Sequence, residues 1–91
     1  MLSYVAILNS RHRKTLEAVF VQPAKSNIAW TDIEALLLSV GCKLIEGSGS
    51  RVRFVYDNKS FAAHRPHPQR EAKEYVVRAL RDYLNTIGIT P

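Results

Sequence analysis

An alternating stretch in the middle of the chain constrains the fold most. Residues 51–57 read Arg-Val-Arg-Phe-Val-Tyr-Asp, so Val52, Phe54 and Tyr56 share one side of an extended chain and both arginines share the other. A period of two is typical of a strand with one buried and one exposed face. We therefore predict a strand here, with its apolar side on the core.

A second strand is expected to follow directly and form a hairpin. Asn58-Lys59 is predicted as the two-residue turn, because asparagine tolerates positive φ. The second strand should end at His64-Arg-Pro-His-Pro68, since proline cannot donate to a ladder. The predicted pairs are Tyr56 with Phe61, Phe54 with Ala63, and Arg53 with His64.

Helices and one more strand surround this hairpin. We predict a helix over 11–21 with Ser10 as N-cap, and a helix beginning at the Thr31–Glu34 capping box and stopping at Gly41. Residues 42–46 read as a short strand, and residues 70–87 as a last helix before Gly88. The expected core stripe of the last helix is Val76, Ala79, Leu80, Tyr83, Leu84 and Ile87. This order predicts an α+β fold, with a three-stranded antiparallel sheet packed against helices in one domain over 1–91.

Composition indicates the kind of partner and compartment. Thirteen Lys and Arg against eight Asp and Glu give a net charge of +5, which favours an anionic partner such as nucleic acid. Cys42 is the one cysteine, so no intramolecular disulfide can form, and we expect a cytoplasmic location. No apolar run approaches the ~20 residues of a membrane span. The first residues lack a basic segment, so no signal peptide is expected.

The hairpin also gathers the chemically interesting side chains. Arg51, Arg53 and Arg65 are expected near one end or face of it, where guanidinium groups could hold phosphates; the alternative is an ordinary solvated face. His64 and His67 could supply the base and the acid that RNA cleavage needs. A structural role for His67 in the turn before the last helix stays open. No acidic residue or cysteine stands beside the histidines, so no metal site and no cofactor are expected.

The order of these segments resembles the HicA toxin family of bacterial toxin–antitoxin pairs. The resemblance covers about residues 31–90 and rests on Gly47-Ser48, Arg51-Val-Arg-Phe54 and His64-Arg-Pro-His-Pro68 between two helices. It implies a double-stranded-RNA-binding-domain-like α-β-β-β-α core over 30–91. Residues 1–29 then form an extension, whose Arg11-His-Arg-Lys-Thr-Leu-Glu17 is similar to that of one subgroup.

The resemblance also implies a metal-independent mRNA endoribonuclease that is silenced by a HicB-type antitoxin covering the active face. Gly47 and Ser48 match the family's glycine-serine, and His67 matches the histidine of its proline-histidine-proline turn. The family's catalytic histidine follows the glycine-serine, and Ser50 is the nearest equivalent here.

Serine is not a base at neutral pH without a neighbour, so the departure at Ser50 leaves three hypotheses. His64 or His67 replaces the missing histidine in an RNA-cleaving toxin. Alternatively the protein binds RNA without cutting it, or its basic face meets an acidic antitoxin and no RNA.

Overall fold

The computed structural model describes residues 8–24, 27–67 and 70–91. The first residues, where no signal peptide is expected, lie outside these ranges, as does Pro68. The elements, in chain order, are helices α2 (Ser10–Val19) and α3 (Trp30–Ser39), strands β1 (Lys43–Glu46), β2 (Arg51–Tyr56) and β3 (Lys59–His64), and helix α4 (Glu74–Ile87). The predicted α+β fold is confirmed. No helix in the described part is long and apolar enough to cross a membrane.

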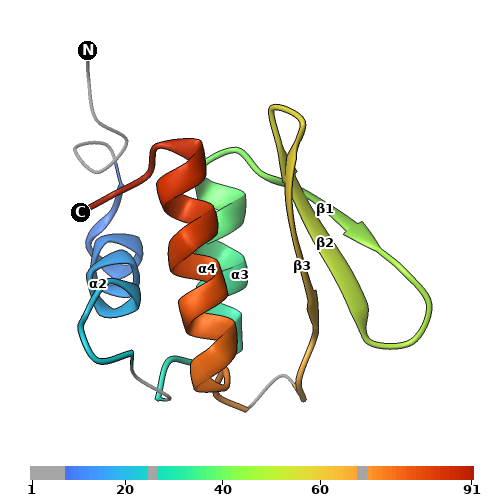
Figure 1. The fold of residues 1–91 in the computed structure, drawn as a ribbon, viewed down its shortest axis with the longest axis horizontal. Coiled ribbons are helices and arrows are strands. Elements are labelled where there is room, and N and C mark those ends of the chain that lie inside the picture. Colours follow the sequence, from blue (N-terminus) through green and yellow to red (C-terminus); the bar gives the residue numbers. More distant parts are fainter. Residues whose placement is uncertain (1–7, 25–26, 68–69) are drawn as a thin grey trace.

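The elements stack in layers. The three strands form one antiparallel sheet in the order β1-β2-β3. Helices α3 and α4 lie beside the sheet, and α2 lies on their far side (Figure 1). One face of the sheet is therefore covered by helices, and the other is open to solvent.

The hairpin register differs from the prediction. Asp57 and Asn58 both have positive φ, 48° and 67°, so they form the turn, and Tyr56 pairs with Lys59. The predicted Asn58-Lys59 turn is wrong by one residue, because a primed two-residue turn needs positive φ at both central positions and lysine resists it. The observed pairs are Phe54 with Phe61, Val52 with Ala63, and Arg51 with His64.

The pairing has moved by two residues along β3, which preserves the faces. Side chains alternate with a period of two, so an even shift keeps the same set on the core side. Val52, Phe54 and Phe61 are buried as predicted. The functional consequence is that His64 lies opposite Arg51 and not Arg53, two residues nearer the Gly47–Ser50 loop.

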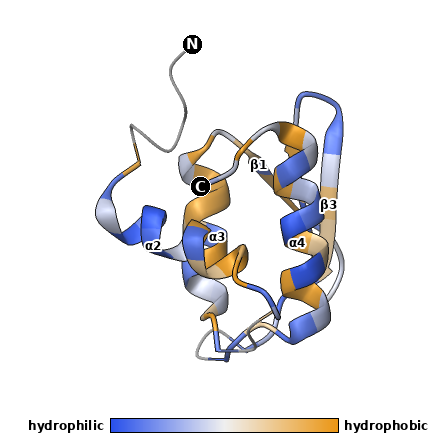
Figure 2. Ribbon diagram, turned by 60° about the vertical axis from the view of Figure 1, so that its left-hand side comes forward, coloured by the Kyte–Doolittle hydropathy of each residue, from blue (hydrophilic) through white to orange (hydrophobic). Residues whose placement is uncertain are grey.

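The core joins α3, α4 and the sheet. Helix α3 is largely hydrophobic, whereas α4 alternates hydrophobic and hydrophilic bands (Figure 2). Aromatic rings connect the layers, with centroid separations of 6.3 Å for Trp30–Phe54, 6.4 Å for Phe54–Phe61 and 5.7 Å for Phe61–Tyr83. Trp30 is only 1% exposed, so it anchors α3 and is not a surface for stacking bases.

Several helix boundaries differ from the expected ones, and α2 ends at Val19, two residues before the predicted end at residue 21. Asn9, and not Ser10, caps α2, since its side chain accepts a hydrogen bond from the His12 amide (2.9 Å). Helix α3 begins at Trp30 and has no side-chain cap. Glu34 therefore makes no capping box; it accepts a hydrogen bond from Trp30 Nε1 (3.2 Å).

Helix α4 begins four residues later than predicted. Ala72, just before it, is buried, and Glu71 forms a backbone bridge with Ala29. Along the helix Val77, Leu80, Tyr83 and Leu84 are buried. Val76 and Ile87 are half-buried, and Ala79 is exposed, so its place in the core stripe belongs to Val77.

Candidate nucleic-acid interface

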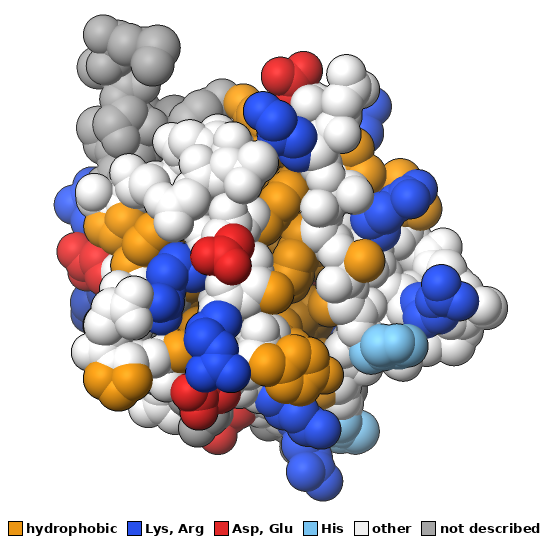
Figure 3. Space-filling model, viewed as in Figure 1, with side chains coloured by type: hydrophobic (Ala, Val, Ile, Leu, Met, Phe, Trp, Pro, Cys, Tyr) orange, Lys and Arg blue, Asp and Glu red, His pale blue; other side chains and the backbone are white. Residues whose placement is uncertain are grey.

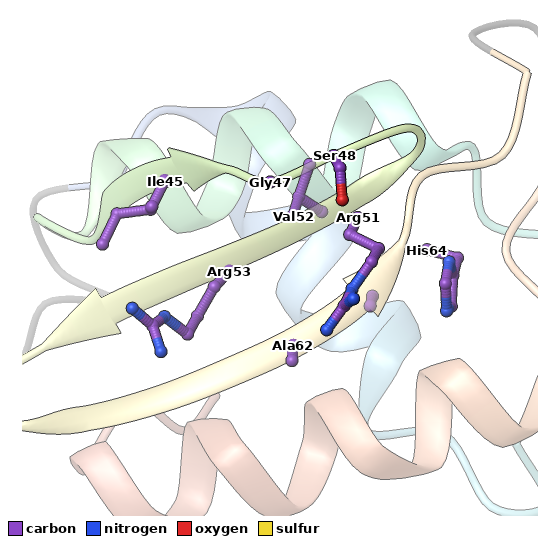
Figure 4. A pocket seen from close by; sticks show the side chains of 9 residues that line it. Ile45, Gly47, Ser48, Arg51, Val52, Arg53, Ala62 and His64 are labelled. Atoms are coloured by element: carbon purple, nitrogen blue, oxygen red, sulfur yellow. The ribbon is translucent and has the colours of Figure 1, made fainter.

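The open face of the sheet carries a groove at the end of the hairpin. It has a volume of about 560 Å³, and its polar lining comprises Ser48, Arg51, Arg53 and His64, beside the backbone of Gly47. We call it the outer groove. Arg51 and Arg53 project from β2 into it, and His64 projects from the end of β3 (Figure 4). The space-filling view shows a histidine side chain close to a basic side chain on the sheet side of the molecule (Figure 3).

The observed register brings His64 to the loop before β2. Ser50 Oγ and His64 Nδ1 are 3.3 Å apart, at the long end of hydrogen-bond distances. The backbone continues this pairing, since the Arg65 amide donates to the Ser50 carbonyl at 2.7 Å. The structure thus brings three of the predicted site residues together, Ser50, Arg51 and His64. With the predicted register, His64 would have faced Arg53.

The glycine-serine loop is a tight connection between β1 and β2. The Gly47 amide donates to the Arg51 carbonyl (2.8 Å), and the Arg51 amide donates to the Ser48 carbonyl (3.3 Å). A Cβ on Gly47 would lie 3.3 Å from Arg51 Cβ, which is closer than most side chains tolerate. Gly47 therefore allows the turn to close against Arg51, and its own N–H is already used. The Ser48 side chain remains exposed in the groove.

Arg65 turns away from the groove and binds two carboxylates. Its guanidinium lies 2.7 Å from Glu46 Oε1 and 2.9 Å from Glu34 Oε1. Its Nε also donates to Glu34 (3.2 Å). The hydrogen bonds to Glu46 and Glu34 raise the pKa of Arg65. These three residues, which we call the Arg65 cluster, tie the end of β3 to both β1 and α3.

Unlike Arg65, Arg51 and Arg53 are not paired with carboxylates among the described residues. Both are exposed on β2, and in the described part of the chain neither has a carboxylate partner. Two unneutralised guanidinium groups on the same strand face form a positive surface suited to phosphate oxygens. The three arginines singled out from the sequence therefore divide into two that face solvent and one held by carboxylates.

His67 lies on the connection from β3 to α4, outside the outer groove. Its side chain is exposed, and its carbonyl accepts a hydrogen bond from the Arg70 amide (2.8 Å). That bond uses the backbone of His67, so the structural and catalytic interpretations of its side chain both stay predictions. Among residues 8–24, 27–67 and 70–91, no group of three or more His, Cys, Asp or Glu side chains could hold a metal ion.

Sequence reasoning missed the two acidic members of the Arg65 cluster. The spacing from Thr31 predicts a capping-box role for Glu34, and no motif marks Glu46 at the end of its short strand. Their sequence separations from Arg65 are 31 and 19 residues, so no local pattern could reveal the contacts.

Comparison with known proteins identifies the family. The family model described as the HicA toxin of bacterial toxin–antitoxin matches residues 30–89, about two thirds of the chain, from the start of α3 to just beyond α4. No curated protein and no solved structure matches. The chain belongs to the HicA toxin family, and it is therefore the toxin of a toxin–antitoxin system, with an antitoxin as its partner.

Proposed function

We propose that this toxin binds mRNA across the outer groove and cleaves it in the cytoplasm, without a metal ion, with His64 as the general base. The observation that carries the proposal is the contact between Ser50 Oγ and His64 Nδ1, directly beside Arg51. An imidazole thereby lies next to the position where the family resemblance expects one. It reaches that place from β3 and not from the loop.

RNA binding is supported by the charge of this face. Arg51 and Arg53 offer guanidinium groups that carry no carboxylate in the described structure, and the chain as a whole has a net charge of +5. Ser48 contributes a hydroxyl from the loop that Gly47 allows to close against Arg51. Arg65 was a candidate phosphate ligand, but its ion pairs favour a positioning role, holding the hairpin end that presents His64.

The proposed reaction is a transesterification within the RNA. His64 Nε2 takes the proton from a ribose 2′-hydroxyl, and the 2′-oxygen forms a bond to the adjacent phosphorus. The bond from phosphorus to the 5′-oxygen of the next nucleotide breaks, and that oxygen takes a proton from an acid, for which His67 and water are the candidates. Arg51 and Arg53 stabilise the charge of the pentacoordinate phosphate.

Ser50 has a defined part in this scheme. When Nδ1–H of His64 donates to Ser50 Oγ, the lone pair of Nε2 is left free to accept the substrate proton. The same bond persists in the imidazolium that forms, since both ring nitrogens then carry hydrogen. The serine therefore orients the base and does not itself attack.

The test is RNA decay by the purified protein with EDTA present. We expect the wild type to cleave, His64→Ala to lose about 10²–10⁴-fold in rate, and Ser50→Ala to lose less, because only orientation is affected. His67→Ala separates the two candidate acids. If the wild type leaves RNAs of varied sequence intact, or if His64→Ala cleaves as fast as the wild type, the enzymatic proposal is wrong.

A second candidate is an RNA-binding toxin that blocks translation without cutting. It is favoured by Ser50 itself, which stands where the family's histidine is expected. Growth arrest that survives in the His64→Ala/His67→Ala double variant, with RNA affinity retained, would support this candidate over the enzyme. Restoring the family residue with Ser50→His would then confer cleavage.

The antitoxin is proposed to be HicB-like and to cover the outer groove. An acidic surface on the partner would neutralise Arg51 and Arg53 and would exclude RNA from the same face. We expect complex formation with the antitoxin to abolish RNA binding. If the basic face serves only the antitoxin, the isolated toxin will show no RNA affinity even at low salt, where phosphate contacts are strongest.

A further inference from the structure

A second groove lies on the other side of His64. It runs between the end of β3 and the beginning of α4 and has a volume of about 540 Å³. His64 lines both this groove and the outer groove, so the two meet at that side chain. A strand of RNA whose reacting phosphate sits at His64 would continue from one groove into the other.

The lining of the second groove differs from that of the outer groove. Apolar surface comes from Pro66, Ala72 and Val76, with the buried Trp30 beneath. Tyr75 stands at the side, 62% exposed, well above the other exposed large hydrophobic side chains of the described chain, the next of which is Leu38 at 47%. An aromatic ring left in water beside an apolar floor costs free energy unless something covers it.

Charge at the rim indicates an anionic ligand of modest charge. Arg70 and Lys73 are exposed there, and in the described structure neither forms an ion pair, while Glu71 is the one acidic lining residue. Arg65 also lines the groove, but it is paired with two carboxylates outside the lining, Glu34 and Glu46, so it offers no free positive charge to a ligand. The free groups therefore sum to a single positive charge. That balance, together with the apolar floor, suits one nucleotide better than a run of phosphates.

We propose that the second groove is a nucleobase subsite, in which Tyr75 stacks on a base of single-stranded RNA flanking the reacting phosphate. Arg70 and Lys73 contact the phosphate of that nucleotide. The inference rests on the proposed function, because it takes RNA as the ligand of this face. It adds a site on α4 and the loop before it, away from the sheet face that carries Arg51 and Arg53. Every base has a flat apolar surface, so stacking of this kind gives affinity with little sequence preference.

The experiment measures binding separately from cleavage. Short single-stranded RNAs made with 2′-O-methyl ribose bind but lack the attacking hydroxyl. A 2-aminopurine placed at successive positions reports stacking as a loss of fluorescence. Wild type should quench one position strongly. Tyr75→Ala should remove that quenching and weaken binding by about 5- to 160-fold, the range expected when a base-stacking aromatic is removed. Tyr75→Phe should retain both.

The control is Leu38→Ala, which truncates an exposed apolar residue of α3 that lines neither groove. It should bind as the wild type does. If Tyr75→Ala binds and quenches like the wild type, the subsite is wrong while RNA binding by the outer groove stands. If the wild type shows the Tyr75-dependent quenching but leaves the unmodified RNA of the same sequence intact, the subsite stands and the catalytic proposal fails. If wild type binds no RNA, both fail.

Discussion

Replacing Arg65 with alanine tests whether this arginine supports the site or contacts RNA. The substitution removes three donated hydrogen bonds, two to Glu34 and one to Glu46. Glu34, which is 27% exposed in the intact protein, keeps Trp30 Nε1 as its remaining donor. The end of β3, including His64, then loses its connections to α3 and β1 through this side chain.

The free energy of unfolding that Arg65→Ala removes can be estimated from how exposed each of its two ion pairs is. The Arg65–Glu46 pair involves a carboxylate 66% exposed, so it contributes about 0.5 kcal/mol, as surface pairs do. The Arg65–Glu34 pair is shielded on both sides, with side chains 28% and 27% exposed, and two N–H groups meet one oxygen. We assign it about 1.5 kcal/mol, the lower end for hydrogen bonds to charged groups. The total of about 2 kcal/mol corresponds to a fall in melting temperature of about 8–16 °C for a domain of this size.

Thermal unfolding and RNA affinity together distinguish a supporting role of Arg65 from direct contact with RNA. The matched control is Arg78→Ala, which breaks the Arg78–Glu74 pair on α4, where the side chains are 56% and 49% exposed; it should cost at most about 0.5 kcal/mol. Below its melting temperature, Arg65→Ala should bind uncleavable RNA within about threefold of wild type, whereas Arg51→Ala should bind clearly more weakly. If Arg65→Ala melts like Arg78→Ala and loses as much RNA affinity as Arg51→Ala, Arg65 is a phosphate ligand and the reasoning is wrong.

Two further predictions concern stability. Gly88 ends α4 with φ of 83° and no atom within 4 Å of a built Cβ, so Gly88→Ala should cost about 1 kcal/mol through backbone strain alone; urea unfolding should show a lower midpoint at unchanged slope. Burial raises the pKa of the Cys42 thiol, and the hydrogen bond with Tyr83 offsets only part of that rise. Burial also raises the pKa of the Tyr83 hydroxyl, and the charge of Cys42 and its hydrogen bond raise it further. Both groups ionise more readily in the unfolded chain, so their contribution to the free energy of unfolding should be constant up to about pH 8 and fall as the pH rises above it. Cys42→Ala/Tyr83→Phe should flatten that decline, and an equally steep decline in the double variant would contradict the assignment.

The faces of the hairpin could be predicted from sequence, whereas its register could not. Alternation in residues 51–57 places Val52 and Phe54 in the core under any even shift of the partner strand. The register depends on which two residues accept positive φ. Asn58 indicates the turn but fits either of its two central positions, so the sequence leaves open whether Asp57 or Lys59 completes it; the structure selects Asp57, which accepts positive φ more readily than lysine does.

The one-residue difference in the position of the turn determines which side chains meet in the candidate site. Moving the turn to Asp57-Asn58 brings His64 opposite Arg51 and within reach of Ser50. The inward turn of Arg65 was equally beyond local patterns, because its partners lie on α3 and β1 and meet it only in the folded chain. Composition and alternation thus predicted a basic hairpin, and tertiary packing determined which of its arginines remain available to a ligand.

The most direct test of the central claim is the chemistry of the cleaved ends. A defined RNA incubated with the purified toxin should yield a 2′,3′-cyclic phosphate on one fragment and a 5′-hydroxyl on the other, because the 2′-oxygen is the nucleophile. A single 2′-deoxy substitution at the cleaved position should block the reaction, and His64→Ala should abolish it while RNA binding persists. Fragments with a 5′-phosphate, or cleavage unaffected by the 2′-deoxy substitution or by His64→Ala, would contradict the account.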